Sequence, residues 1–146
     1  MMVKIIARTI SGKIIEGLES PFTIGDHVRV VDGGRQYSTY YEAFIYFWGN
    51  KERYYLPWKG QNKDKIGEMP KTWKIINMAV HEVGNVIIYH IRSRDGKNCV
   101  VNGKGIELTN FHNRNRVLFD CLEIYKLPLN GRVTPHEWTE KLYKIR

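Results

Sequence analysis

Residues 25–31 read Gly25-Asp26-His27-Val28-Arg29-Val30-Val31, which is a turn followed by a strand. Apolar Val28 and Val30 alternate with polar residues, as in a strand with one face in a protein core. The stretch Trp73–Leu108 has the same character, because short apolar runs are separated by glycine turns. Short strands at this spacing indicate a small barrel or sandwich. The turns are Gly84-Asn85, Asp95-Gly96 and Asn102-Gly103.

The chain has 146 residues, a length typical of one domain. Its hydrophobic content of 42% and charged content of 26% are ordinary for a globular protein and exclude wholesale disorder. The formal net charge of +8 favours acidic partners, with nucleic acid the first candidate. The alternative is a soluble protein that happens to be basic.

Two cysteines, Cys99 and Cys121, are too few for a disulfide framework and lack the spacing of a zinc site. Both lie in apolar stretches, so we expect buried free thiols. We find neither the apolar core of a signal peptide nor the roughly 18 consecutive apolar residues of a membrane helix. The expected location is therefore the cytoplasm, or the host cytoplasm for a phage-encoded protein, with no membrane association.

We expect a single domain over residues 1–146, made of three parts. An N-terminal hairpin occupies 1–20, because strand-like Val3–Ala7 and Lys13–Leu18 flank the turn Ser11-Gly12. A barrel core occupies 22–108, with an inserted helix and loop at 39–72. A C-terminal extension with a helix occupies 109–146.

The inserted helix is predicted from Thr39 and Glu42, which fit a capping box, and from aromatic residues at helical spacing. We interpret this aromatic stripe as a core face rather than a ligand platform. The C-terminal helix is predicted from Thr134-Pro135-His136-Glu137 and extends to about Tyr143. The segment Val117–Leu127 fits a strand and a helix equally well.

The predicted core of the barrel consists of alternating apolar residues on its strands. His90, in the apolar run that begins at Val86, is interpreted as a buried, hydrogen-bonded imidazole. The core residues are Val28, Val30, Ile75, Ile87, Tyr89 and Ile91.

The candidate binding residues are basic and aromatic side chains in the irregular loop and in the later turns. Lysine and arginine neutralise phosphates, and aromatic rings stack on exposed bases. The alternative is that these charges merely solvate turns. The predicted residues are Tyr54, Tyr55, Trp58, Lys59, Lys63, Lys65, Arg92, Arg94, Lys97, Lys104, Arg114 and Arg116.

No catalytic or metal motif is found in the sequence. The histidines His81, His90, His112 and His136 match no zinc-finger or metalloprotease spacing. The segment His112–Arg116 lacks the second histidine and acidic ligands of a nuclease. We therefore expect no cofactor, no bound metal and no enzymatic activity.

The pattern resembles an SH3-like barrel of the kind found in transcription-factor-type modules and small phage proteins. The resemblance rests on Gly25-Asp26-x-Val28-x-Val30, the strand Ile87–Ile91, the turn Asp95-Gly96 and Gly105-Ile106-x-Leu108. It implies a β-rich α+β fold: an SH3-like small β-barrel core with an N-terminal hairpin, an inserted helix and a C-terminal helix.

Three functions follow as hypotheses. The first is a non-enzymatic, phage-type module that engages nucleic acid or a nucleic-acid-bearing host complex. The second is a protein inhibitor of a host defence system, similar to an anti-CRISPR, that binds an acidic host protein directly. The third, a metal-dependent hydrolase, has the least support because no constellation of catalytic residues is present.

Overall fold

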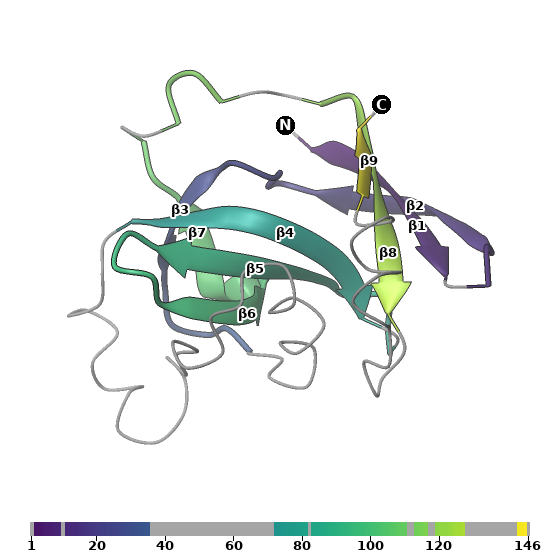
Figure 1. The fold of residues 1–146 in the computed structure, drawn as a ribbon, viewed down its shortest axis with the longest axis horizontal. Coiled ribbons are helices and arrows are strands. Elements are labelled where there is room, and N and C mark those ends of the chain that lie inside the picture. Colours follow the sequence, from purple (N-terminus) through teal and green to yellow (C-terminus); the bar gives the residue numbers. More distant parts are fainter. Residues whose placement is uncertain are drawn as a thin grey trace.

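The structure, a computed structural model, describes residues 2–9, 11–35, 72–81, 83–110, 113–116, 119–127 and 143–145. In these residues nine strands form one strongly curled sheet, which confirms the β-rich class (Figure 1). A short 3-10 helix, η4 (Gly103–Gly105), precedes β7. The strands are β1 (Val3–Thr9), β2 (Ile14–Ser20), β3 (His27–Val30), β4 (Trp73–His81), β5 (Ile87–Ser93), β6 (Asn98–Asn102), β7 (Ile106–Leu108), β8 (Cys121–Leu127) and β9 (Tyr143–Ile145).

The sheet curls around β4. Strand β5 pairs antiparallel along one edge of β4. On the other edge, β3 pairs antiparallel with the first residues of β4, and β8 pairs parallel with its last residues. The β4–β5 register shifts between Ile75 and Asn77, and such a bulge bends a strand and increases its twist. The full order is β2-β1-β8-β4-β3-β7, with β6 beyond β5 and β9 beside β8.

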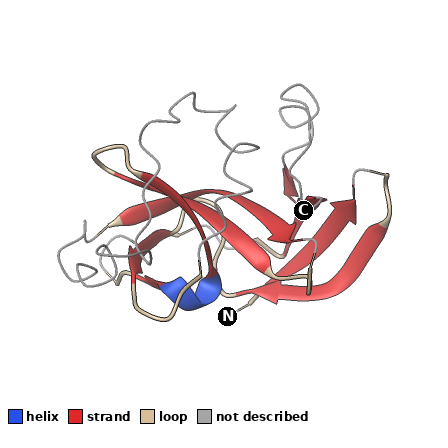
Figure 2. Cartoon of the chain, turned by 90° about the horizontal axis from the view of Figure 1, so that it is seen from below, coloured by secondary structure: helices blue, strands red, loops and turns tan. Residues whose placement is uncertain are grey.

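Strands β1 and β2 form the N-terminal hairpin that the Ser11-Gly12 turn predicts. The Thr9 amide donates to the Lys13 carbonyl at 2.9 Å, and Gly12 has a φ of +96°, a conformation that favours glycine. Strand β1 also pairs in parallel with β8. Figure 2 shows the hairpin extending beyond one side of the curled sheet, so β8 joins it to the remaining strands.

One continuous apolar core packs against the strands, and Trp73 at the start of β4 is its largest fully buried side chain. Five of the six core positions predicted from the sequence are confirmed as buried. The sixth, Ile87, is only partly buried because it begins β5, directly after the exposed Val86. The five confirmed residues are Val28, Val30, Ile75, Tyr89 and Ile91.

The C-terminal part of the described chain adds strands. The segment Cys121–Leu127 is a strand, which decides between the two structures that its sequence allowed. The last helix was predicted to extend to about Tyr143, and Tyr143 itself begins β9 and lies opposite Ile124 of β8. There β9 pairs with an edge of β8 whose backbone groups would otherwise be unpaired. Cys121 is partly exposed rather than buried, because it is the first residue of its strand.

Both α-helices expected from the sequence lie outside the described residues. The inserted helix and loop fall on 39–72, of which only Thr72 is described, and the last helix falls on residues 134–142 before Tyr143. The predicted turn at Asn102-Gly103 is the beginning of η4. Within the described ranges, we find no helix with the length and apolar character needed to cross a bilayer.

The core assignment predicts a graded response to truncation. Ile91 is fully buried, so Ile91→Ala should lower the free energy of unfolding by about 2–5 kcal/mol by leaving a cavity. Ile87→Ala should cost less, and Ile14→Ala, at an exposed position, should change stability by no more than about 0.5 kcal/mol. Urea unfolding followed by tryptophan fluorescence measures all three. Equal losses at Ile91 and Ile14 would contradict the assignment.

Candidate nucleic-acid interface

The predicted partner-binding residues fall into two groups. The first group lies outside the described residues: Tyr54, Tyr55, Trp58, Lys59, Lys63 and Lys65. The second group lies on β5, in the turn after it, on η4 and in the segment that follows β7: Arg92, Arg94, Lys97, Lys104, Arg114 and Arg116. Their positions decide which of them can contact one partner together.

The turn between β5 and β6 presents Arg94 to solvent. Asp95 accepts a hydrogen bond from the Ser93 hydroxyl and lies 3.6 Å from the Lys97 ammonium. The Ser93 hydroxyl, and then the charge of Lys97, hold the pKa of Asp95 below its usual value. Asp95 therefore stays ionised and offsets part of the Lys97 charge. Arg94 is exposed and has no ion pair within the described residues.

Lys104 lies apart from this turn. It is exposed on η4, which follows the far end of β6. Five residues of β6, at about 3.3 Å each, separate the two ends by roughly 16 Å. The structure therefore does not bring Lys104 together with Arg94 and Lys97.

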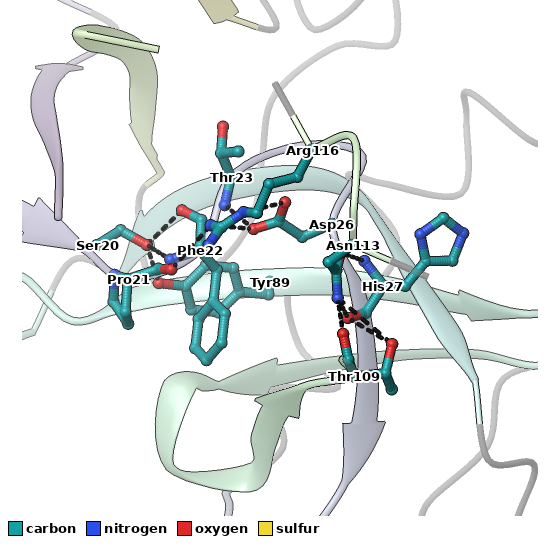
Figure 3. Close-up of polar contacts among 10 residues, drawn as sticks. All are labelled: Ser20, Pro21, Phe22, Thr23, Asp26, His27, Tyr89, Thr109, Asn113 and Arg116. Carbon is teal, nitrogen blue, oxygen red and sulfur yellow. Dashed lines mark hydrogen bonds and ion pairs between the residues drawn. The ribbon is translucent and has the colours of Figure 1, made fainter. Parts of the chain in front are cut away.

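Arg116 holds a buried carboxylate inside the fold (Figure 3). Its guanidinium donates to both oxygens of Asp26, at 3.1 Å from Nε and 2.7 Å from Nη2, and to the Pro21 carbonyl at 3.2 Å. The Asp26 side chain is 1% exposed and that of Arg116 is 19% exposed. Asp26 also accepts from the Thr23 amide at 2.9 Å. Arg116 thus stabilises the turn that precedes β3.

Asn113 fastens the same segment to the first residue of β3. The His27 amide donates to the Asn113 Oδ1 at 2.9 Å, and Asn113 Nδ2 donates to the His27 carbonyl at 2.7 Å. The amide side chain thus satisfies the backbone of His27 as a neighbouring strand would. In Figure 3 the His27 imidazole points away from this cluster. Arg114, the next residue, is exposed beside the start of β3.

A row of basic side chains crosses three neighbouring strands near these turns. His27 of β3 lies opposite Lys74 of β4, and Lys74 lies opposite Arg92 of β5. The residues before and after each of them in the chain are buried, so the three side chains share the opposite face of the sheet, on which Lys74 is exposed and His27 and Arg92 are partly exposed. We call His27, Lys74 and Arg92 the basic row. With Arg94 and Arg114 beside its two ends, it forms what we call the basic face.

Two members of the basic row, His27 and Lys74, were not among the predicted site residues. The alternation around each of them indicates an outward side chain, and this signal was available in the sequence. That they lie in one row with Arg92 depends on the register of three strands, which the sequence does not give.

His90 lies on the same face of β5 as Arg92 but inside the protein, as predicted. Its Nε2 is 3.1 Å from the Asn98 Oδ1, and the ring is almost fully buried. Burial lowers the pKa of His90 to about 3, although the hydrogen bond to Asn98 opposes this shift. The nearby charge of Arg92 lowers the pKa further. The imidazole is therefore neutral near pH 7.

The buried hydroxyls serve the fold. Ser20 Oγ donates to the Phe22 carbonyl at 2.7 Å and accepts from the Phe22 amide at 3.0 Å, while the Tyr89 hydroxyl lies 2.5 Å from it. Burial raises the pKa of Tyr89, so this phenol stays protonated.

In the described part of the chain, no three His, Cys, Asp or Glu residues are grouped as a metal site would require. Comparisons with protein-family models, curated proteins and solved structures find no match for this chain.

The contacts of Arg116 predict a stability role. Arg116→Ala should lower the free energy of unfolding by about 3 kcal/mol or more, because it leaves the buried Asp26 carboxylate unpaired. Arg94→Ala removes the same charge from an exposed position and should cost no more than about 0.5 kcal/mol. Denaturant unfolding of both variants measures the difference. Losses of similar size in the two would show that the Asp26 contact contributes little.

The burial of His90 predicts a pH dependence of stability. The unfolded chain binds a proton at an ordinary histidine pKa near 6.5, whereas the folded protein does not until about pH 3. The contribution of the neutral His90 to the free energy of unfolding is therefore complete above about pH 6.5. It is lost as the pH falls toward 3, by up to about 1.4 kcal/mol per pH unit. Denaturant unfolding of wild type and His90→Gln measures this between pH 7 and 4.5. As the pH falls, the free energy of unfolding of wild type should decrease more than that of His90→Gln. A pH-independent difference would contradict this.

Proposed function

We propose that this protein is a non-enzymatic module that binds nucleic acid, or a nucleic-acid-bearing host complex, through the basic face. The observation that supports this proposal is the basic row, with Arg94 and Arg114 beside it. Lysine and arginine side chains gathered on one face of a sheet match the regular negative charge of a phosphate backbone. The net charge of +8 supports an acidic partner in the same way.

The finer assignment of the fold, an SH3-like barrel, belongs to this proposal. Strands β3 to β7 form the continuous order β7-β3-β4-β5-β6. In this order β7, the last of the five along the chain, pairs with β3, the first. The turn η4 lies directly before that last strand. This arrangement agrees with the resemblance noted in the sequence. In the proposed molecule, the hairpin β1–β2 and strand β8 are additions to a five-stranded barrel.

The aromatic part of the proposed site is Tyr54, Tyr55 and Trp58, with the lysines Lys59, Lys63 and Lys65. These residues lie outside the described ranges and enter the proposal from their sequence alone. Stacking of bases on aromatic rings is tolerant of sequence, and phosphate contacts are as well. The proposal is therefore for binding with little sequence preference.

A second candidate function is inhibition of a host defence complex by direct protein contact. The observation that favours it is an apolar patch in the β4–β5 turn, where Val83 is 62% exposed and Val86 is 37% exposed. This turn lies at the opposite end of β4 from Lys74. An interface centred on such residues would tolerate high salt, whereas phosphate contacts would not.

Charge reversal tests the first function. Arg94→Glu and Arg114→Glu should each weaken binding of a fluorescent oligonucleotide, and each lost phosphate contact should flatten the log–log salt slope by roughly 0.7–0.9. Lys13→Glu changes the net charge equally but lies beside the turn of the β1–β2 hairpin, so it is the matched control. Arg94→Glu and Lys13→Glu should melt within a few degrees of wild type, because their side chains are exposed.

Two results would contradict the proposal. One is binding that all three variants weaken equally, which would reflect net charge rather than a site. The other is binding that persists at high salt and is lost on changing Val83 to Asp, which would favour the protein-inhibitor function.

A further inference from the structure

The registers of this sheet place opposite charges across from each other, with one exception. Lys4 lies opposite Glu19, Arg29 lies opposite Glu107, and Glu123 lies opposite Lys144. The Arg29 and Glu107 side chains form an ion pair. The exception is Lys74, which lies directly opposite Arg92. Like charges at such positions destabilise a sheet, because the Cβ atoms are only about 4.5–5.5 Å apart.

Neither of the described residues that flank this pair in the registers carries a negative charge. The next residue beyond Lys74 is His27, and the next beyond Arg92 is Asn98. The Asn98 amide is used elsewhere, since its Oδ1 is bonded to His90 and its Nδ2 donates to the Gly96 carbonyl. In the described part of the chain, neither Lys74 nor Arg92 has an ion pair.

Arg92 carries a second unfavourable feature. Its Nε is buried and has no hydrogen-bond acceptor among the described residues. A buried donor of this kind costs free energy because it has lost its bond to water. Lys74, in contrast, is exposed, so the pair is accessible from solvent on its β4 side.

We propose that Lys74 and Arg92 form a binding position for one phosphate group. A phosphate oxygen would accept from the Arg92 guanidinium, and a second oxygen would accept from the Lys74 ammonium. A bound dianion or phosphodiester thus removes the repulsion between the two cations, and arginine suits such an anion because it can donate two parallel hydrogen bonds. This inference rests on the proposed function, where the group is a phosphate of the nucleic-acid backbone. Free inorganic phosphate has the same chemistry.

The test uses thermal melting of the whole protein in inorganic phosphate, at constant ionic strength set with chloride. The Tm of wild type should rise by roughly 5 °C once phosphate far exceeds its dissociation constant. Lys74→Glu should melt above wild type without phosphate, because it places opposite charges across the strands, and should not respond to phosphate. Lys13→Glu has the same net charge and should respond as wild type does. Lys74→Gln repeats the test without a reversed charge.

Oligonucleotide binding separates this site from the wider function. With nucleic acid as the partner, Lys74→Glu should raise the dissociation constant roughly tenfold or more, beyond the effect of Lys13→Glu. A phosphate response that Lys74→Glu abolishes, in a protein that binds no oligonucleotide, would support the phosphate position and overturn the nucleic-acid function. A wild type that does not respond to phosphate, or a Lys74→Glu variant that responds equally, would overturn the position itself.

Discussion

The whole architecture depends on the two-sided pairing of β4. This strand has β5 along one edge and two different partners, β3 and then β8, along the other. If β4 were straight, β3 and β8 would lie in one flat sheet along its edge. The register shift between Ile75 and Asn77 lies between the part of β4 that pairs with β3 and the part that pairs with β8, and it allows the strand to bend there. The curl of the sheet, and the outer face on which Lys74 lies, follow from that bend.

Side chains from the segment after β7 satisfy polar groups at the start of β3 that strand pairing does not. The turn before β3 has a buried carboxylate, Asp26, and its guanidinium partner comes from Arg116, far along the chain. His27, the first residue of β3, pairs with β4 on one side. On its other side the Asn113 amide bonds to both backbone groups of His27, and the Thr109 amide also donates to the His27 carbonyl, at 3.1 Å. Asn113 and Arg116 are three residues apart in one turn, so this short segment fixes the entrance to β3. It thereby fixes where the basic row begins.

Local signals in the sequence predicted local structure well. The glycine turns at Gly12, at Gly84-Asn85 and at Asp95-Gly96 each join two antiparallel strands, because a turn needs only the residues within it. The segment Val117–Leu127 could not be assigned, because some of its apolar residues fit a helix and others fit a strand. Leu118, Cys121, Leu122 and Tyr125 fit the helix, whereas Val117 and Ile124 fit the strand. Its parallel pairing with β1 has no local signal at all.

The candidate site divides in the same way. Arg94 was predicted as a binding residue from its charge and its place in a turn, and it is exposed there. Arg116 looked like a surface cation because nothing nearby in the sequence reveals Asp26 as its partner. Lys74 was overlooked as a binding residue since its significance comes from facing Arg92, and a bulge in β4 sets that register. Charge and exposure can be read from the sequence, but the juxtaposition of two charges cannot.

The parallel pairing of β1 with β8 has a consequence for how the chain assembles. Lys4 lies opposite Cys121, so β1, once synthesised, cannot pair with β8 until the chain between these two residues has followed. Contacts between such distant residues slow folding, because the loop between them must close before the contact forms. Until then the hairpin β1–β2 has an unpaired strand edge and an uncovered apolar face with Val3, Ile5 and Ala7. Newly made chains are therefore most prone to associate with one another before β8 pairs with β1 and covers this strand edge.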